Sequence, residues 1–161
     1  MTILDLTVEK VENIISSSPR KNGSYNLFFK INNHIGLKLS LTKKQRDSNY
    51  KHQENASKIG LGPNVYGKID NVNYENCEYY GYFTEIVDVI LMKEKSYDFI
   101  RLLYKTFSED IKELVENLKK CGFIFEDNHL GNIGVKNGKI ICIDFDEPDN
   151  CYRCLKYMDR N

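Results

Sequence analysis

Three oxygen-bearing side chains in one stretch constrain this chain more than any other feature. Asp127 is followed by Asn132 five residues later, and Asp144 stands at the end of an apolar run. The dipeptide Asn137-Gly138 favours a tight turn that folds residues 133–144 into a hairpin. This places Asp127 and Asn132 on one loop and Asp144 at the adjacent strand end, where the three side chains can converge.

The chemistry of these side chains admits a functional and a structural interpretation. Carboxylate and amide oxygens suit magnesium, which usually binds through one or two carboxylates plus substrate phosphates. A carboxylate left uncoordinated beside the metal can orient or deprotonate a hydroxyl. In the structural interpretation, Asp127 and Asn132 are turn residues and Asp144 caps a strand.

Length and composition exclude several classes of protein. The chain has 161 residues, with Lys+Arg and Asp+Glu balanced at 23 each, so the charge indicates no nucleic-acid or membrane partner. No apolar run is long enough to span a bilayer. The five cysteines read as reduced thiols of a cytoplasmic protein. Cys151-x-x-Cys154 could supply half of a zinc site, but no second such pair follows.

The first half of the chain reads mainly as strands. Four strands are expected at residues 25–31, 34–41, 64–69 and 74–86. Residues 1–17 form either a fifth strand or a short helix, and counting them as a strand gives a total of five. Asn32-Asn33 should join the first pair, and an Asn-rich turn the second. Lys38 alternates with Leu37 and Leu39, so it faces away from them. It is either an exposed lysine or a cation presented into a cleft.

Two helices are expected. Residues 42–59 are polar and stop at Gly60-Leu-Gly-Pro63, which is typical of a helix end. This helix carries Glu54, close enough to pair with Lys38, although spacing does not separate Gln53 from Glu54 and most helix glutamates are solvated.

The second helix is expected from Tyr97 onward, with a capping box at Thr106 and Glu109 and an end at Gly122. Its apolar residues recur at helical spacing, as expected of core scaffolding. The domain boundary falls near residue 88, which gives the segments 1–88 and 89–161.

Asp127-Asn-His-Leu-Gly-Asn132 followed by Ile143-Asp-Phe145 resembles the catalytic loop and metal-binding motif of the protein-kinase-like superfamily. The His129-x-x-Asn132 form is similar to aminoglycoside and choline phosphotransferases and to small RIO-type kinases. The resemblance implies an α+β, two-lobed fold. It implies a five-stranded antiparallel N-lobe with one helix and a truncated, mainly helical C-lobe.

The resemblance also implies roles in transfer of the γ-phosphoryl group of ATP. Asp127 would accept or orient the hydroxyl, and Asn132 and Asp144 would hold magnesium. Lys38 would bind the nucleotide phosphates, with Glu54 as its helix partner. The remaining nucleotide contacts would be Gly23 and Ser24 in the phosphate-covering hairpin, and Glu85 and Val87 in the segment that receives adenine.

The chain departs from the family pattern at several positions. Phe125 replaces a usual histidine, Asp146 replaces a glycine, and only 17 residues follow Asp144. We therefore expect either an ATP- and magnesium-dependent phosphotransferase, a small Ser/Thr protein kinase-like enzyme or a small-molecule hydroxyl kinase, or a binding module that has lost transfer. The shortened second lobe predicts self-association or a protein partner that covers it.

Overall fold

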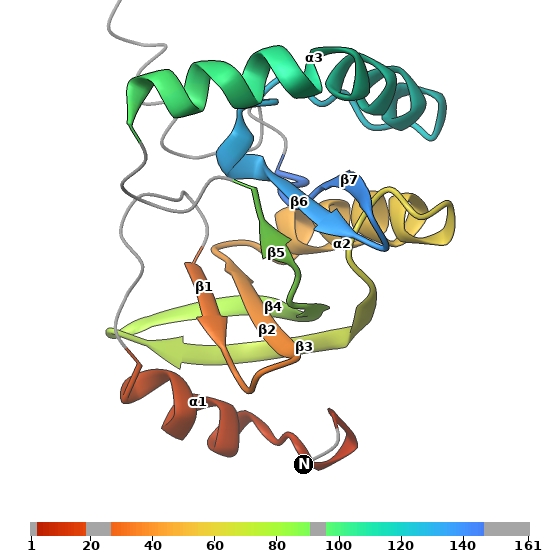
Figure 1. Cartoon of the computed structure of the whole chain (residues 1–161). Helices are drawn as coiled ribbons and strands as arrows, with labels where there is room; N and C mark the ends of the chain where they lie inside the picture. Colours follow the sequence, from red (N-terminus) through yellow and green to blue (C-terminus); the bar gives the residue numbers. More distant parts are fainter. Residues whose placement is uncertain (1–2, 19–26, 91–95, 147–161) are drawn as a thin grey trace, which may run out of the picture. The chain divides into compact units, whose positions relative to one another are not determined.

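The structure is a computed structural model that describes residues 3–18, 27–90 and 96–146. Internal contacts divide the chain into two units, the first comprising Met1–Lys51, Val65–Ile86 and Asp146–Asn161 and the second His52–Asn64 and Val87–Phe145. The described residues form three α-helices and two antiparallel sheets (Figure 1). The α+β class predicted from the sequence is confirmed.

The first unit is built on a four-stranded antiparallel sheet in the order β1-β2-β4-β3. Its strands are β1 (Leu27–Lys30), β2 (Ile35–Ser40), β3 (Val65–Tyr74) and β4 (Cys77–Glu85). A short 3-10 turn, η1 (Ile3–Asp5), leads into α1 (Val8–Ser16), which lies against β3 (Figure 1). Helix α2 (Lys43–Lys58) begins in this unit and ends in the second.

The N-terminal segment is helical, so the predicted total of five strands is wrong for the described part of the sheet. The Thr7 hydroxyl accepts a hydrogen bond from Lys10 N at 3.3 Å and caps α1. Val11 and Ile15, one helical turn apart, are buried in a core shared with β-strand residues such as Leu37. The helix covers one face of the sheet because its apolar residues recur every three to four positions.

Two connections in the sheet differ from the predicted turns. The loop between β1, which ends at Lys30, and β2, which begins at Ile35, is longer than the predicted two residues. Within it, Asn32 Oδ1 accepts hydrogen bonds from His34 N at 2.8 Å and Ile35 N at 2.9 Å. Asn71, with a φ of 56°, lies at an irregularity inside β3. The turn to β4 is made instead by Glu75-Asn76, both with positive φ.

The second unit contains α3 (Tyr97–Lys120), the short 3-10 helix η2 (Leu130–Asn132) and a three-stranded sheet in the order β5-β6-β7. Its strands are β5 (Asp88–Val89), β6 (Ile133–Lys136) and β7 (Lys139–Cys142). The core joins one face of α3 to this sheet and to aromatic residues of the following loop. The buried core residues are Ala56, Ile111, Leu114, Leu118, Phe123, Phe125, Leu130, Ile133, Cys142 and Phe145.

Helix α3 begins earlier than the predicted capping box. Its N-cap is Ser96, whose hydroxyl accepts from Phe99 N at 3.3 Å. Thr106 is inside the helix, where its hydroxyl donates to the Leu102 carbonyl at 2.8 Å. The predicted capping box at Thr106 is therefore wrong. The threonine is accommodated inside a continuous helix because its hydroxyl bonds back to the preceding turn.

The hairpin of β6 and β7 is confirmed. Asn137 and Gly138 have φ values of 52° and 73°, as a tight two-residue turn requires. Strand β5 adds a third strand that no sequence pattern indicates. No helix in the described part of the chain combines the length and the apolar character needed to cross a membrane.

Candidate active site

The loop after α3 is fixed by alternating buried and exposed residues. Phe123 and Phe125 enter the core of the second unit, whereas Ile124 and Glu126 are exposed. Asp127 follows and is exposed, so its carboxylate faces solvent. The two aromatic anchors thus fix the backbone immediately before the exposed Glu126 and Asp127 and present Asp127 at the surface.

Asp127 and Asn132 are brought together as the sequence predicts. Asn132 Nδ2 donates to the Asp127 carbonyl at 2.9 Å and to Asp127 Oδ2 at 3.1 Å. The intervening turn is anchored by fully buried Leu130, whose backbone N–H donates to the Tyr104 hydroxyl of α3 at 3.3 Å. With Nδ2 engaged on Asp127, the amide oxygen of Asn132 is directed away from that pair.

His129 completes the surroundings of Asp127. Gly131 N donates to His129 Nδ1 at 3.0 Å, so Nδ1 acts as an acceptor and the neutral ring carries its proton on Nε2. Nε2 lies 3.5 Å from Asp127 Oδ1. One carboxylate oxygen of Asp127 is therefore bonded to Asn132 and the other faces the histidine.

The β6–β7 hairpin sets Asn132 beside the residue that precedes Asp144. Ile133 pairs with Cys142, and Ile143 N donates to the Asn132 carbonyl at 3.0 Å, which extends the pairing beyond both strands. Asp144 comes next, before fully buried Phe145. Asn132 and Asp144 therefore leave the hairpin at the same end.

The donor set at this end of the hairpin fits magnesium accompanied by phosphate oxygens. It offers the Asn132 amide oxygen and the Asp144 carboxylate, with the Asp127 carboxylate next to Asn132. Two protein oxygen ligands suffice for this metal when the substrate supplies the rest. In the described part of the chain no three His, Cys, Asp or Glu side chains are grouped to hold a metal alone.

Lys38 lies in β2 of the first unit and alternates with its neighbours as predicted. Leu37 and Leu39 are buried in the core beneath α1. Lys38 pairs across the ladder with Tyr82, and its Nζ lies 5.8 Å from the centroid of the Tyr82 ring. The Tyr82 ring meets Tyr50 of α2 edge-to-face, with centroids 5.6 Å apart. Lys38 is therefore directed to the face of the sheet that α2 covers.

Glu54 lies in the part of α2 that belongs to the second unit. Its side chain is 39% exposed and lies 3.7 Å from Lys58 Nζ, one helical turn away. The adjacent Gln53 is fully buried and donates its Nε2 to the Pro63 carbonyl at 3.1 Å. A Lys38–Glu54 pair would join residues of the two separate units, and it stays a prediction.

The predicted nucleotide contacts are distributed over several segments. Gly23 and Ser24 lie outside the described residues. Glu85 ends β4 in the first unit and pairs with Ile35 of β2. Val87 begins the next segment of the second unit and lies against Gly134 of β6. Their assignment to an adenine site also stays a prediction.

Sequence reasoning missed a buried arginine in the first unit. Arg46 of α2 is 2% exposed, and its Nη1 donates to the Ile69 and Gly81 carbonyls at 3.0 and 2.9 Å. Its Nη2 and Nε donate to Asp70 and Asp47 at 2.7 and 2.8 Å. The guanidinium thereby bonds α2 to both β3 and β4.

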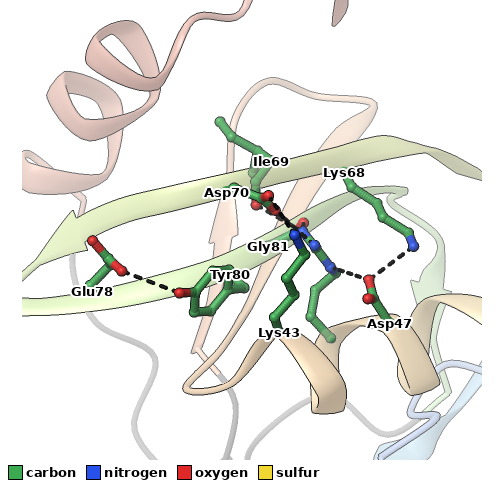
Figure 2. Close-up of polar contacts among 9 residues, drawn as sticks. Lys43, Asp47, Lys68, Ile69, Asp70, Glu78, Tyr80 and Gly81 are labelled. Atoms are coloured by element: carbon green, nitrogen blue, oxygen red, sulfur yellow. Dashed lines mark hydrogen bonds and ion pairs between the residues drawn. The ribbon is translucent and has the colours of Figure 1, made fainter.

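Two lysines complete this arginine cluster (Figure 2). Lys68 donates to Asp47 Oδ1 at 2.9 Å, and Lys43 lies 3.4 Å from Asp70. The bond from Lys68, with those from Arg46, holds the pKa of Asp47 below its ordinary value despite partial desolvation. The bond from Arg46 lowers the pKa of Asp70 in the same way, with Lys43 contributing. No sequence pattern identifies this cluster, because arginine in a polar helix usually marks a solvated face.

A cavity of about 730 Å³ in the second unit lies apart from the predicted catalytic residues. It is formed by α3, the segment after α2 and the β6–β7 turn, and its apolar lining includes Leu61, Phe107, Leu114 and Ile140. None of the predicted site residues lines it. The candidate site is therefore the exposed end of the hairpin with its preceding loop, and not this cavity.

No family model, curated protein or solved structure matches the chain.

Proposed function

We propose that the chain is an ATP- and magnesium-dependent phosphotransferase with a two-lobed, protein-kinase-like fold. The observation that carries this proposal is the geometry around Asn132. Its side chain bonds Asp127 and its carbonyl bonds Ile143, the residue before Asp144. A loop carboxylate is thus in contact with one proposed magnesium ligand, and the second ligand follows the residue that is bonded to the first, which supports phosphoryl transfer at this end of the hairpin.

The two units support the proposed lobes separately. The first is an antiparallel sheet with Lys38 on the face toward α2. The second joins a long helix to the loop and hairpin that carry Asp127, Asn132 and Asp144. A nucleotide-binding sheet with a strand lysine, and a helical segment with a catalytic loop, are the two parts that the sequence resemblance implies.

In the proposed reaction, an alcohol oxygen forms a bond to the γ-phosphorus of ATP as the bond between that phosphorus and the β–γ bridging oxygen breaks. ADP leaves, and the hydroxyl proton passes to the Asp127 carboxylate. Asn132 and His129 orient this carboxylate through Oδ2 and Oδ1. Lys38 binds the α- and β-phosphates.

Asn132 and Asp144 would hold the magnesium ion. When bound, the metal neutralises charge on the β- and γ-phosphate oxygens. The acceptor is an alcohol group, either a protein serine or threonine or a small-molecule hydroxyl. We expect the enzyme to work in the cytoplasm, the compartment inferred from its cysteine usage.

A transfer assay tests this function. Purified chain with magnesium and γ-labelled ATP should label itself or a generic protein or alcohol acceptor, and Asp127→Ala should abolish labelling. Removal of magnesium by a chelator should have the same effect as the substitution. Equal, background-level labelling by the two proteins would contradict the proposal.

Exposed apolar residues on α3 favour a second candidate, a kinase-like binding module. Tyr97, Phe99 and Leu102 are 78%, 40% and 58% exposed and lie in the N-terminal half of α3, which is rich in large apolar side chains. Exposed apolar patches commonly mark protein interaction sites. A thermal-shift scan separates the candidates, because ATP with magnesium should stabilise a nucleotide-binding enzyme by about 2.7 kcal/mol at a hundredfold excess over Kd. No stabilisation would favour the binding module.

A further inference from the structure

Asn49 of α2 has a buried side-chain amide whose nitrogen is hydrogen-bonded and whose oxygen is not. Its side chain is 1% exposed, and Nδ2 donates to Asp146 Oδ1 at 2.6 Å. Its Oδ1 has no hydrogen-bond partner, and it is the one fully buried side-chain polar atom of the described residues in that condition. Buried polar atoms are nearly always paired, so this oxygen calls for an explanation.

The unpaired oxygen carries a penalty that an apolar side chain would avoid. A buried acceptor without a donor is destabilising, whereas leucine, of similar branched shape, would bury no polar atom at this position. The bond to Asp146 accounts for Nδ2 alone. A donor that hydrogen-bonds Oδ1 when a ligand is bound would explain why the amide oxygen is also buried at this position.

Lys38 is a cationic side chain of this unit that faces α2, whereas the donors of Arg46, one helical turn from Asn49, are already engaged on Ile69, Asp70, Gly81 and Asp47. Strand β2 directs Lys38 to the face covered by α2, over the ring of Tyr82. Tyr82 in turn packs on Tyr50, the residue after Asn49. Lys38 and Asn49 therefore share one layer between sheet and helix. A lysine ammonium has three donors, so a bond to Asn49 leaves two for phosphate or other acceptors.

We propose that Asn49 is a positioning residue of the phosphotransferase site, and the inference rests on the function proposed above. When nucleotide is bound, Oδ1 accepts a hydrogen bond from the Lys38 ammonium while Nδ2 continues to hold Asp146. Asp146 is two residues after Asp144 in the chain. One buried amide thus steadies the phosphate-binding lysine and the segment that follows a magnesium ligand.

A neutral amide suits this position better than a carboxylate would. Asparagine can donate and accept at once, whereas an aspartate could only accept. At 2.6 Å from Asp146, a second carboxylate would add like-charge repulsion. Glu54, the helix residue that the sequence suggests for this task, is partly exposed and lies beside Lys58. The assignment of the helix partner to Asn49 explains the buried amide and leaves Glu54 on the surface.

Binding of a non-hydrolysable ATP analogue with magnesium tests the assignment. Dissociation constants from calorimetry and melting temperatures without ligand would be measured for wild type, Asn49→Leu, Asn49→Asp and the exchange Asn49→Asp with Asp146→Asn. Gln45→Leu is the matched control, since Gln45 is another buried amide of α2. The exchange keeps a hydrogen bond between the two positions in the reverse sense and retains an oxygen toward Lys38.

Asn49→Leu should weaken analogue binding by about tenfold or more, since a hydrogen bond to a charged group is worth at least about that factor. Asn49→Asp should also bind more weakly, and the exchange variant should recover most of the affinity. Gln45→Leu should bind as wild type does. The melting temperature of unliganded Asn49→Leu should not fall by more than that of Gln45→Leu.

Three results would overturn the inference in distinguishable ways. If wild type binds the analogue and Asn49→Leu binds it equally well, Asn49 is a structural residue, whatever happens to the melting temperature. The exchange variant covers the case in which Asn49→Leu does not fold, because failure to regain affinity over Asn49→Asp would also refute the role. If wild type itself does not bind, the proposed function fails and the role of Asn49 fails with it.

Discussion

Replacement of Arg46 by methionine should destabilise the protein substantially, for reasons visible in the first unit. The guanidinium is 2% exposed and donates buried hydrogen bonds to the carbonyls of Ile69 and Gly81. Methionine has similar length but no donor. The substitution leaves both carbonyls without this partner and leaves Asp47 and Asp70 without their arginine.

The expected loss can be estimated from these partners. Each buried carbonyl left without its donor costs about 1–3 kcal/mol. Asp47 and Asp70 are both 42% exposed, so water can replace the arginine and each lost ion pair contributes about 0–1 kcal/mol. Relief of the buried guanidinium's desolvation partly offsets these terms. We therefore expect a net loss of about 2–4 kcal/mol in the free energy of unfolding.

Urea unfolding followed by circular dichroism measures this quantity. Lys43→Met is the matched control, because Lys43 also contacts Asp70 but is 61% exposed. That variant should lose less than about 0.5 kcal/mol. A stability of Arg46→Met within about 0.5 kcal/mol of wild type would show that the cluster does not secure α2 to the sheet. An equal loss in both variants would show that the buried bonds are not the cause.

Three further outcomes are expected. Because the folded-state pKa values of Asp47 and Asp70 are lowered, the stability that these two carboxylates contribute should be present above the ordinary aspartate pKa and be lost as the pH falls below about 4. In urea titrations from about pH 7 to about pH 2.5, the free energy of unfolding of Arg46→Met should therefore fall by less than that of wild type. Gly134→Ala should destabilise by about 1–3 kcal/mol in the same assay, since a Cβ there would lie 2.8 Å from Ile143 Cγ2 and 3.0 Å from the Asp88 carbonyl; wild-type stability would show that this strand can shift. Tyr104→Phe removes the acceptor of the Leu130 N–H and should cost about 1 kcal/mol, whereas an unchanged melting temperature would show that water replaces the hydroxyl.

The hairpin and its neighbouring loop could be predicted because their signals are local. Asn137-Gly138 specifies a tight turn by its backbone preference, and the turn then fixes the register that sets Asn132 near Ile143. The Asp127–Asn132 contact follows from the five-residue spacing once that loop is short. Such features need no information about distant parts of the chain.

Features that depend on tertiary burial could not be predicted. Helix α2 reads as a solvated helix, yet Arg46, Asn49 and Gln53 lie on a buried face of it. Several of their partners are backbone carbonyls and carboxylates that are distant in the sequence, such as Asp146, 97 residues from Asn49. The sequence of residues 1–17 is equally ambiguous, because its mixture of apolar and acidic residues suits a strand as well as the observed α1.

The most direct test of the central claim is transfer of γ-phosphoryl from labelled ATP by wild type, Asp127→Ala and Asp144→Asn, with and without magnesium. Asp110→Asn is the control, since Asp110 is an exposed carboxylate of α3 outside the proposed site. We predict magnesium-dependent transfer by wild type and the control, and loss of transfer in the other two variants while their fold is kept. Transfer that survives Asp127→Ala and Asp144→Asn, or its absence from folded wild type with magnesium and a broad set of protein and alcohol acceptors, would contradict the account.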